Sequence, residues 1–304
     1  MTSSSLSISF AHALQAARDA AGAQQHPTHT LYVVATPISN LADISLRALH
    51  VLGLVDAIAC EDTRHTRQML HAYGLERSAH QLLAVHQHNE AEAAHTVLER
   101  LAQGQRVAYV SDAGTPAISD PGARLVQAVR AAGWRVLPLP GASSITTLLS
   151  AAGMTGDGFV FAGFLPSKSA EREQAVQAMA QERRAVVLLE APHRIGALAK
   201  ALAALGDRQV TVGRELTKQF EQIETLRADG LPAWLEARPE HQRGEFVLVV
   251  HDQATTASRG EGERILQCLL TELPVKTAVR LAAELSGEPR NALYERALAL
   301  KQGD

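Results

Sequence analysis

Cysteine is scarce in this sequence, with only two residues, Cys60 and Cys268, among 304. Two thiols far apart in the chain give neither a disulfide framework nor a paired-cysteine zinc motif. An iron–sulfur cluster held by three or more thiolates is excluded as well. We therefore expect a chain that works in a reducing compartment and holds no metal ion.

Long apolar runs are also missing. No stretch approaches the roughly 20 apolar residues that a helix needs to cross a bilayer. The first basic residue is Arg18, so the charged start of a secretory signal is absent. We expect a cytoplasmic protein without membrane contact. Residues 1–29, rich in Ser, Ala, Gln and His, are interpreted as a flexible extension in which residues 11–21 can form a short helix.

Several common motifs are absent. The sequence has no G-x-x-x-x-G-K-[ST] loop and no G-x-G-x-x-G fingerprint after its first predicted strand, which disfavours ordinary kinases, GTPases and dinucleotide dehydrogenases. Ser143 and Ser144 do not stand in a G-x-S-x-G elbow, which disfavours a hydrolase. Because the net charge is −3, nucleic-acid binding would need locally clustered Lys and Arg.

Short β-branched runs alternate with helical stretches from residue 31 to residue 139. This alternation is typical of strands joined by crossover helices in a largely parallel sheet. We therefore predict an α/β domain over residues 30–140. Its predicted strands are residues 31–35, 57–61, 82–86, 107–111 and 136–139, and its predicted helices are residues 44–52, 63–73, 91–103 and 123–132.

The pattern changes after residue 140. A second α/β domain is predicted over residues 141–252, and a helical domain over residues 258–304. Between them lies a polar linker, residues 251–262, and two Pro-containing breaks divide the tail into three helices, of which the last two resemble a helix-turn-helix. The predicted elements of the second domain are a helix at residues 143–152 and strands at residues 159–163, 186–190, 210–214 and 245–250.

Polar loops follow the predicted strands, at the edge where open α/β sheets bind ligands. The most informative loop is SDAGTPAISDPG, residues 111–122. In it, Gly114 lets a ligand approach the backbone, Thr115 offers a hydroxyl, and Asp112 offers a carboxylate to a ribose or an ammonium group. Asp120 is better placed to cap the following helix.

Three more loops reach the same edge, namely TPISNLAD from residue 36, EDTR from residue 61 and PLPGASS from residue 138. Asn40, Asp43, Asp62 and Ser143 are all suited to cap helices, so each has an ordinary structural reading. Their gathering beside the loop at 111–122 still predicts a polar cluster that a protein core would not need. In the second domain, GFLPSK, EAPHR and RELTK each follow a predicted strand.

Together, TPISNLAD, EDTR, SDAGTPAISDPG, PGASS, GFLPSK, EAPHR and RELTK resemble, in order and spacing, the bacterial ribosomal RNA small subunit methyltransferase I family, which has a tetrapyrrole-methylase-like α/β fold. The resemblance implies a homodimer with S-adenosylmethionine bound in the cleft between two α/β domains. It also implies methyl transfer to the ribose 2′-hydroxyl of a decoding-site cytidine in 16S rRNA. Two departures are Ser39, where the family usually has Gly, and Ala142-Ser143, where Pro-Ser is commoner.

The resemblance further implies roles for individual residues. Because a sulfonium methyl group is already activated, the enzyme's tasks are to align the ribose oxygen and remove its proton. The expected cofactor contacts are Pro37, Leu41, Asp112, Gly114, Thr115, Ser143, Ser144, Phe161 and Glu215. The candidate proton acceptors or orienting groups are Asp62, Glu190 and Lys218, and the candidates for holding RNA phosphate are Arg64, Arg194 and Arg214.

Two other functions stay open at this point. A tetrapyrrole methyltransferase would share the fold, although EDTR, RELTK and the helical tail argue against it. A non-catalytic ribosome-binding protein would bind no cofactor. The tail has as many acidic as basic residues, so RNA recognition by its last helix, through Arg290 and Arg296, competes with dimer packing or with covering the core. The partner is either naked rRNA or an assembled small subunit.

Overall fold

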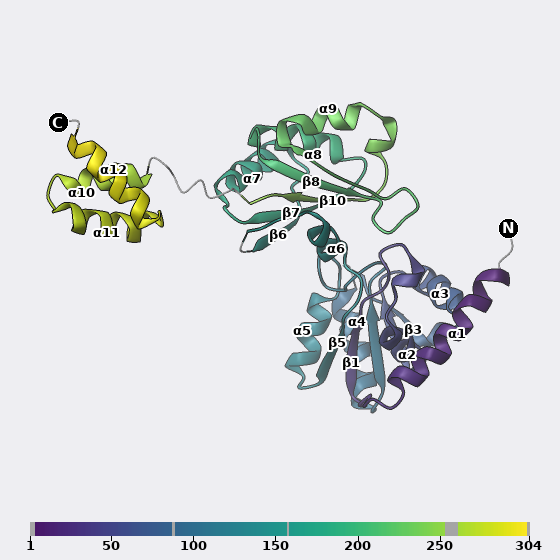
Figure 1. Ribbon diagram of the computed structural model, residues 1–304. Coiled ribbons are helices and arrows are strands. Elements are labelled where there is room, and N and C mark those ends of the chain that lie inside the picture. The colour runs from purple at the N-terminus through teal and green to yellow at the C-terminus, as the bar shows by residue number, and fades with distance from the viewer. Residues whose placement is uncertain (1–3, 87–88, 157, 253–260, 303–304) are drawn as a thin grey trace.

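The computed structural model describes residues 4–86, 89–156, 158–252 and 261–302. Within these residues the chain forms two five-stranded sheets and a separate group of helices near the carboxyl terminus. The two sheets lie in adjacent lobes, and the carboxyl-terminal helices stand apart from both (Figure 1). In the described part of the chain, none of the helices has the length and apolar character needed to span a membrane.

The first sheet is entirely parallel, with strand order β3-β2-β4-β1-β5. Its inner strands β1, β2 and β4 are almost completely buried, as expected for a parallel sheet between two layers of helices. This confirms the predicted α/β organisation. The strands are β1 (Thr30–Val34), β2 (Ala57–Cys60), β3 (Leu82–Ala84), β4 (Arg106–Val110) and β5 (Arg135–Leu139).

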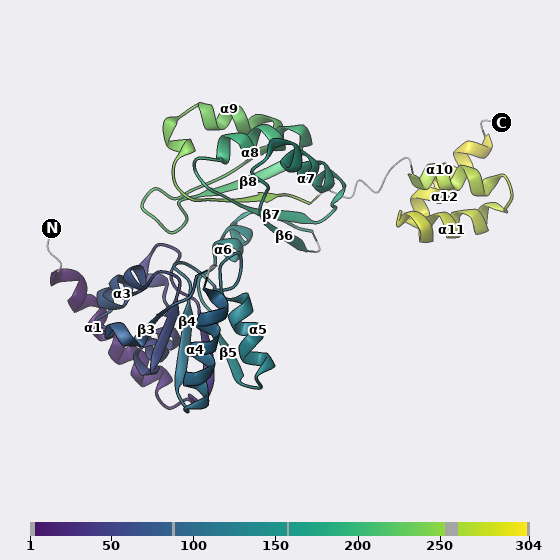
Figure 2. The ribbon, with the colours of Figure 1, turned by 180° about the vertical axis from the view of Figure 1, so that it is seen from behind.

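Helices cover both faces of the first sheet (Figure 2). One face packs against α1, α2 and α3 through side chains such as Tyr32 and Ile58, and the other packs against α4 and α5 through Leu31 and Ala59. Adjacent residues of a strand point to opposite faces, so each strand serves both cores. The helices are α1 (Ser4–Ala21), α2 (Leu46–Leu54), α3 (Thr63–Ala72), α4 (Glu90–Ala102) and α5 (Ala123–Ala131).

The amino-terminal segment differs from the flexible extension predicted for residues 1–29. Helix α1 packs along α2, and Ala17 is fully buried between them. The Phe10 ring meets the Tyr73 ring edge-on, with centroids 5.0 Å apart. Tyr73 in turn donates a 2.6 Å hydrogen bond to the Leu41 carbonyl, in the loop after β1. The sequence predicted a short helix here but not its packing, because a small side chain such as that of Ala17 gives a weak apolar signal.

The second sheet is mixed, with strand order β6-β7-β10-β8-β9. Strands β6 and β7 are parallel, and the remaining pairs are antiparallel. Helix α6 packs on one face through Ile145 and Leu148, while α7, α8 and α9 cover the other. The elements are β6 (Phe159–Phe164), β7 (Ala185–Glu190), β8 (Gln209–Arg214), β9 (Gln222–Arg227), β10 (Phe246–Val250), α6 (Ser144–Ala151), α7 (Ser169–Gln181), α8 (Ile195–Leu202) and α9 (Leu231–Glu236).

Sequence reasoning missed strand β9. It is an edge strand and is exposed along most of its length. It therefore lacks the run of buried apolar side chains that marks β8 and β10, and its alternating polar sequence resembles a loop. The other nine strands of the described residues begin and end within one residue of the predicted ranges, except that β3 ends two residues early.

Helices α10 (Glu261–Leu270), α11 (Val275–Ser286) and α12 (Arg290–Gln302) enclose a small core of their own. Buried Glu288 joins them, because it accepts a 3.2 Å hydrogen bond from the Gly262 amide and pairs with Arg296. Arg296 is therefore committed to the fold of this domain.

The domain limits predicted above remain proposals. The first sheet ends at Leu139, the second begins at Phe159, and the intervening α6 packs on the second sheet. This arrangement supports a boundary between residues 140 and 141. Most of the predicted linker, residues 253–260, lies outside the described residues.

Candidate functional site

Hydrogen bonds connect the loops that follow β1, β2 and β4. Thr36 and Gly114 pair as two antiparallel residues, with a 2.9 Å bond from Thr36 N to Gly114 O and a 3.0 Å bond from Gly114 N to Thr36 O. The Asp62 amide donates to Asp112 Oδ1 at 3.1 Å. The carboxyl ends of these parallel strands therefore present one connected surface.

The loop after β5 joins the same surface through Thr115, whose hydroxyl donates to the Ala142 carbonyl at 3.1 Å. The neighbouring Gly114 has φ 78, in the left-handed region that favours glycine. A Cβ at this position would lie 3.3 Å from Ile38 Cγ2. Glycine is thus favoured here both by the backbone conformation and by the close approach of the loop after β1.

Two adjoining pockets open beside this surface. The smaller has a volume of 330 Å³ and the larger 590 Å³. Ile38, Ala113 and Glu245 line both, so the pockets form one cleft with two parts. Since Ile38 and Ala113 follow strands of the first sheet and Glu245 precedes β10 of the second, the cleft lies between the two α/β lobes.

The smaller pocket combines unpaired hydroxyls with an apolar wall. Ser143 and Ser144 line it, and neither hydroxyl has a hydrogen-bond partner among the described residues. Ser143 stands at the N-cap position of α6 but makes no capping bond. Ile118 and Phe164 line the same pocket although 46% and 50% of their surface is exposed. Convergent polar groups on an apolar wall are typical of small-molecule sites.

Asp120 lies in the smaller pocket and does not cap α5, contrary to the prediction. Glu90 of α4 does so instead, with Oε1 accepting a 2.9 Å hydrogen bond from the Gly122 amide. No local spacing signals this contact, because the two residues are 32 positions apart. Burial raises the pKa of Asp120; a hydrogen bond from Ser111 opposes the rise, and the charge of Asp112 adds to it.

Asp62 caps α3 and lines neither pocket. Its Oδ1 accepts hydrogen bonds from the backbone amides of Arg64 at 2.7 Å and His65 at 3.4 Å, and its Oδ2 pairs with the Arg64 guanidinium at 3.2 Å. The side-chain and backbone bonds from Arg64 hold the pKa of Asp62 below its ordinary value, which makes it a weak proton acceptor. The adjacent Glu61 behaves oppositely, since burial and three neighbouring carboxylates raise its pKa.

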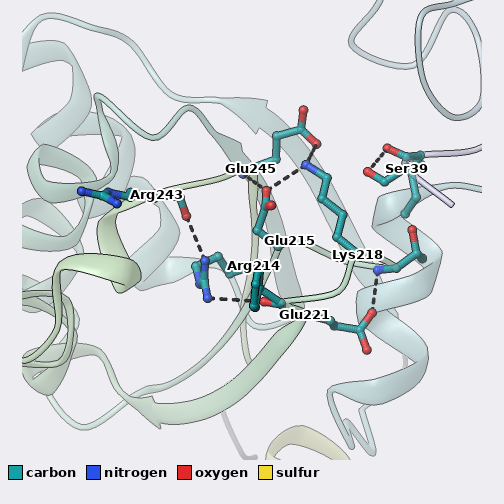
Figure 3. A network of polar contacts seen from close by, with 10 residues as sticks. Ser39, Arg214, Glu215, Lys218, Glu221, Arg243 and Glu245 are labelled. Atoms are coloured by element: carbon teal, nitrogen blue, oxygen red, sulfur yellow. Dashed lines mark hydrogen bonds and ion pairs between the residues drawn. The ribbon is translucent and has the colours of Figure 1, made fainter. Parts of the chain in front are cut away.

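Lys218 reaches the larger pocket from the loop after β8 (Figure 3). Its Nζ donates to Glu215 Oε1 at 2.8 Å and pairs with Glu245 Oε2 at 3.4 Å. Burial lowers the pKa of Lys218, but the bonds and charges of these two carboxylates outweigh it and raise the pKa above its ordinary value. Lys218 is therefore a cation at neutral pH, which suits an orienting donor and not a proton acceptor.

The backbone of this loop is strained. Glu215 and Thr217 have φ 52 and 65, although neither is glycine. Strain of this kind costs about 1–3 kcal/mol per residue and gathers at functional sites. The Thr217 amide donates to Glu221 Oε2 at 2.6 Å, and Gly244 leaves room for Glu215, because a Cβ there would lie 2.4 Å from Oε1. The loop is thus shaped to present Lys218.

Arg214, predicted to hold RNA phosphate, is buried (Figure 3). Its guanidinium donates to the carbonyls of Phe220 and Arg243, each at 3.3 Å, and to Gln222 Oε1 at 3.4 Å. These bonds fasten the loop after β8 to the loop before β10. The structure therefore gives Arg214 a supporting role, because a phosphate has no access to it.

Glu190 lines the smaller pocket and is only 3% exposed. Its Oε1 accepts a 2.8 Å hydrogen bond from the Ala191 amide and lies 3.0 Å from Arg194 Nε. Its Oε2 is buried without a hydrogen-bond partner in the described part of the chain. Arg194 also donates to the Leu165 carbonyl. Arg194 therefore joins the EAPHR and GFLPSK loops, and is not positioned primarily as a phosphate ligand.

The remaining predicted contacts divide between the two pockets. Phe161 and Glu215 line neither, since Phe161 packs in the core under α6 and Glu215 acts through Lys218. Pro37, Leu41 and Asp112 line the larger pocket, and Gly114, Thr115, Ser143 and Ser144 line the smaller. Sequence reasoning missed His65, Gln68, Met69, Ile118, Phe164 and Glu245, of which the first three share one face of α3 directly after EDTR.

No group of three or more His, Cys, Asp or Glu side chains that could hold a metal occurs among the described residues. Cys60 is buried, and burial raises its pKa to about 11.

A pocket of 690 Å³ lies beside Arg208 and His251, at the opposite end of β8 and β10 from the cleft. Arg208 donates there to the backbone carbonyls of His251, Met179, Glu182 and Arg184, so its guanidinium is occupied within the fold.

Comparison with known families gives two matches. Residues 30–232 match the tetrapyrrole (corrin/porphyrin) methylases, and residues 256–301 match the RsmI C-terminal HTH domain.

Similar proteins cover most of the chain. Proteins named ribosomal RNA small subunit methyltransferase I are 46% identical over 272 residues in Escherichia coli O157:H7, covering 88% of this chain and 94% of the relative. In Xylella fastidiosa strain Temecula1 the identity is 47% over 273 residues, covering 87% of this chain and 97% of the relative.

Solved structures share the fold at low identity. A diphthine synthase aligns with a TM-score of 0.55 and 15% identity, covering 73% of this chain and 90% of its own. A cobalt precorrin-4 methyltransferase aligns with a TM-score of 0.54 and 17% identity, covering 73% and 94% respectively. These likenesses show the two-lobed fold alone.

The link between Glu190 and Arg194 predicts a large effect on stability. Arg194→Met should lower the free energy of unfolding by about 2 kcal/mol, because the buried Glu190 carboxylate loses its cation. The loss should not be larger, because a quarter of the Arg194 side chain is exposed to solvent. Adding Glu190→Gln should recover at least half of the loss. Chemical denaturation measures both, with the exposed Arg130→Met on α5 as control, expected within about 0.5 kcal/mol of the unsubstituted protein. If Arg194→Met cost no more than the control, the assigned link would be wrong.

Proposed function

This chain belongs to the family of tetrapyrrole (corrin/porphyrin) methylases and is closely related to ribosomal RNA small subunit methyltransferase I, and on that premise we propose that it methylates small-subunit ribosomal RNA. The methyl donor is S-adenosylmethionine. We further propose that the acceptor is the ribose 2′-hydroxyl of a decoding-site cytidine in 16S rRNA.

The smaller pocket carries this proposal, because its composition suits a cationic nucleoside. Ile118 and Phe164 provide apolar surface for a base, and the hydroxyls of Ser143 and Ser144 are available to its polar groups. Asp120, Glu190 and Glu245 bring carboxylates, which favour a ligand with an ammonium and a sulfonium group. A volume of 330 Å³ lies at the lower end of the range for cofactor sites.

The larger pocket suits the acceptor nucleotide. It adjoins the smaller pocket at Ile38, Ala113 and Glu245, so a hydroxyl held in one part of the cleft lies next to a donor held in the other. When bound, the cofactor supplies an activated methyl group. The protein then has to align the acceptor oxygen and receive its proton.

The positions of the candidate side chains support the following division of these two tasks. Lys218 is a cation held at the larger pocket, so it orients the acceptor by donating a hydrogen bond. Asp62 is occupied as a helix cap, and Glu190 faces the smaller pocket. The carboxylates that line the larger pocket are Asp112 and Glu245. We assign receipt of the proton to this pair.

We also propose that the protein acts as a homodimer in the cytoplasm. The scarcity of cysteine favours a reducing compartment. Ile223 in the edge strand β9 and Phe220 in the loop before it are 36% and 68% exposed and give an apolar surface for a second copy. The carboxyl-terminal helices are proposed to take part in recognition of the subunit, and Arg290 remains available for this because only Arg296 is committed to Glu288.

Two matched glycine substitutions test the cofactor pocket. Gly114→Ala and Gly133→Ala both place a Cβ at a positive φ, of 78 and 80, so each should cost about 1 kcal/mol of stability. Only Gly114→Ala brings the new atom against Ile38 inside the cleft, whereas nothing lies within 4 Å at Gly133. Calorimetry should show about tenfold weaker binding of S-adenosylhomocysteine to Gly114→Ala alone, a loss of about 1.4 kcal/mol. Equal affinities for the two variants would refute the assigned pocket.

Methyl transfer tests the reaction itself. The protein is incubated with labelled S-adenosylmethionine and either small ribosomal subunits, naked 16S rRNA or a precorrin-type tetrapyrrole. Label is expected in the RNA, and mass mapping should place it on a cytidine ribose. Asp112→Asn should lower the rate about 100-fold or more if it belongs to the proton-accepting pair. Label in the tetrapyrrole, or on a base, would contradict the proposal.

A further inference from the structure

Helix α3 borders the larger pocket and contains no acidic residue. His65, Gln68, Met69 and Ala72 line the pocket. Their spacing of three, four and seven residues places them on one face of the helix. One side of α3 is thus a wall of the cleft in which we place the acceptor nucleotide.

The adjoining face of α3 is exposed and basic. It carries Arg64, Arg67 and His71, again at intervals of three and seven residues. Arg64 pairs with Asp62 at 3.2 Å but leaves 85% of its side chain exposed, and His71 pairs with Glu76. Arg67 has neither a hydrogen bond nor an ion pair with any described residue. The structure therefore leaves an unpaired, exposed guanidinium on the helix that borders the larger pocket.

We propose that the exposed face of α3, through Arg67 and Arg64, binds the phosphates that flank the nucleotide entering the larger pocket. A nucleotide within a strand has a phosphate on each side, and a guanidinium binds phosphate through paired N–H donors. The two arginines are about 4.5 Å apart along the helix axis, since an α-helix rises 1.5 Å per residue. They adjoin the wall formed by His65 and Gln68, so a strand bound here would lead into the pocket.

The charge of the rest of the site makes such a surface necessary. The chain has a net charge of −3, and four carboxylates gather at the strand ends behind α3. Their field repels phosphate, so RNA needs a local row of cations to dock. Of the arginines predicted to hold RNA, Arg214 is buried and Arg194 is tied to Glu190, whereas Arg64 is exposed. Arg67 is the cation that the sequence analysis overlooked.

This inference rests on the proposed function and deepens it, so the test separates the two. The full chain and its Arg67→Gln, Arg67→Glu and Arg64→Gln/Arg67→Gln variants are titrated with naked 16S rRNA and with small subunits at several salt concentrations. Binding of S-adenosylhomocysteine is measured in parallel. Arg130→Gln is the matched control, because Arg130 is also exposed but lies on α5, across the first sheet.

Arg67→Gln is expected to weaken RNA binding at least about threefold and to reduce the slope of log K against log salt by about 0.7 to 0.9, the value of one phosphate contact. Arg67→Glu and the double variant should lose more. Binding of S-adenosylhomocysteine should stay within about twofold of the unsubstituted protein, because these side chains lie outside the smaller pocket.

Three results would overturn the inference. Arg67→Glu with the RNA affinity and salt slope of Arg130→Gln would show an ordinary solvated face. Loss of affinity for intact subunits but not for naked RNA, with an unchanged salt slope, would assign the face to a protein partner. An unsubstituted protein that binds neither RNA nor subunits would refute the proposed function itself, and this inference with it.

Discussion

The two backbone hydrogen bonds between Thr36 and Gly114 are the constraint on which the site depends. They join the loop after β1 to the loop after β4 although the central strands of the sheet have already ended. Because the Asp62 amide and the Ala142 carbonyl attach two further loops to this pair, the whole strand-end surface is fixed without help from a ligand. A rigid floor of this kind is what preorganised binding requires.

Electrostatics divides the cleft into regions with different partners. Three carboxylates, those of Asp120, Glu190 and Glu245, line the smaller pocket, which favours a cationic ligand there. The larger pocket adds a cation, Lys218, which the carboxylates of Glu215 and Glu245 keep protonated. The exposed face of α3 adds further positive charge at the rim. A chain with low net charge can thus serve a cationic donor and a polyanionic acceptor within one cleft.

The sequence predicted the fold and the meeting of the loops well, because both follow from local patterns. Apolar runs and strand-end loops locate β1, β2, β4 and β5, and the rule for parallel sheets brings their loops together. Such reasoning could not predict which side chains form hydrogen bonds with residues far away in the sequence. Glu90, and not Asp120, caps α5. The two carbonyls that accept hydrogen bonds from Arg214 belong to Phe220, in an irregular segment, and to Arg243, far along the chain. Lys218 lines the larger pocket, and one of the two carboxylates that hold it, Glu245, is 27 residues away, so no local spacing signals that contact.

The central claim is that residues of both lobes bind one molecule of the methyl donor in the smaller pocket. A crystal structure of the protein with S-adenosylhomocysteine tests it most directly. The account predicts a nucleoside that contacts Ser143 or Ser144 from one side and the Glu190 loop from the other, next to Gly114. Density in the 690 Å³ pocket beside Arg208, or on a surface of one lobe alone, would contradict it.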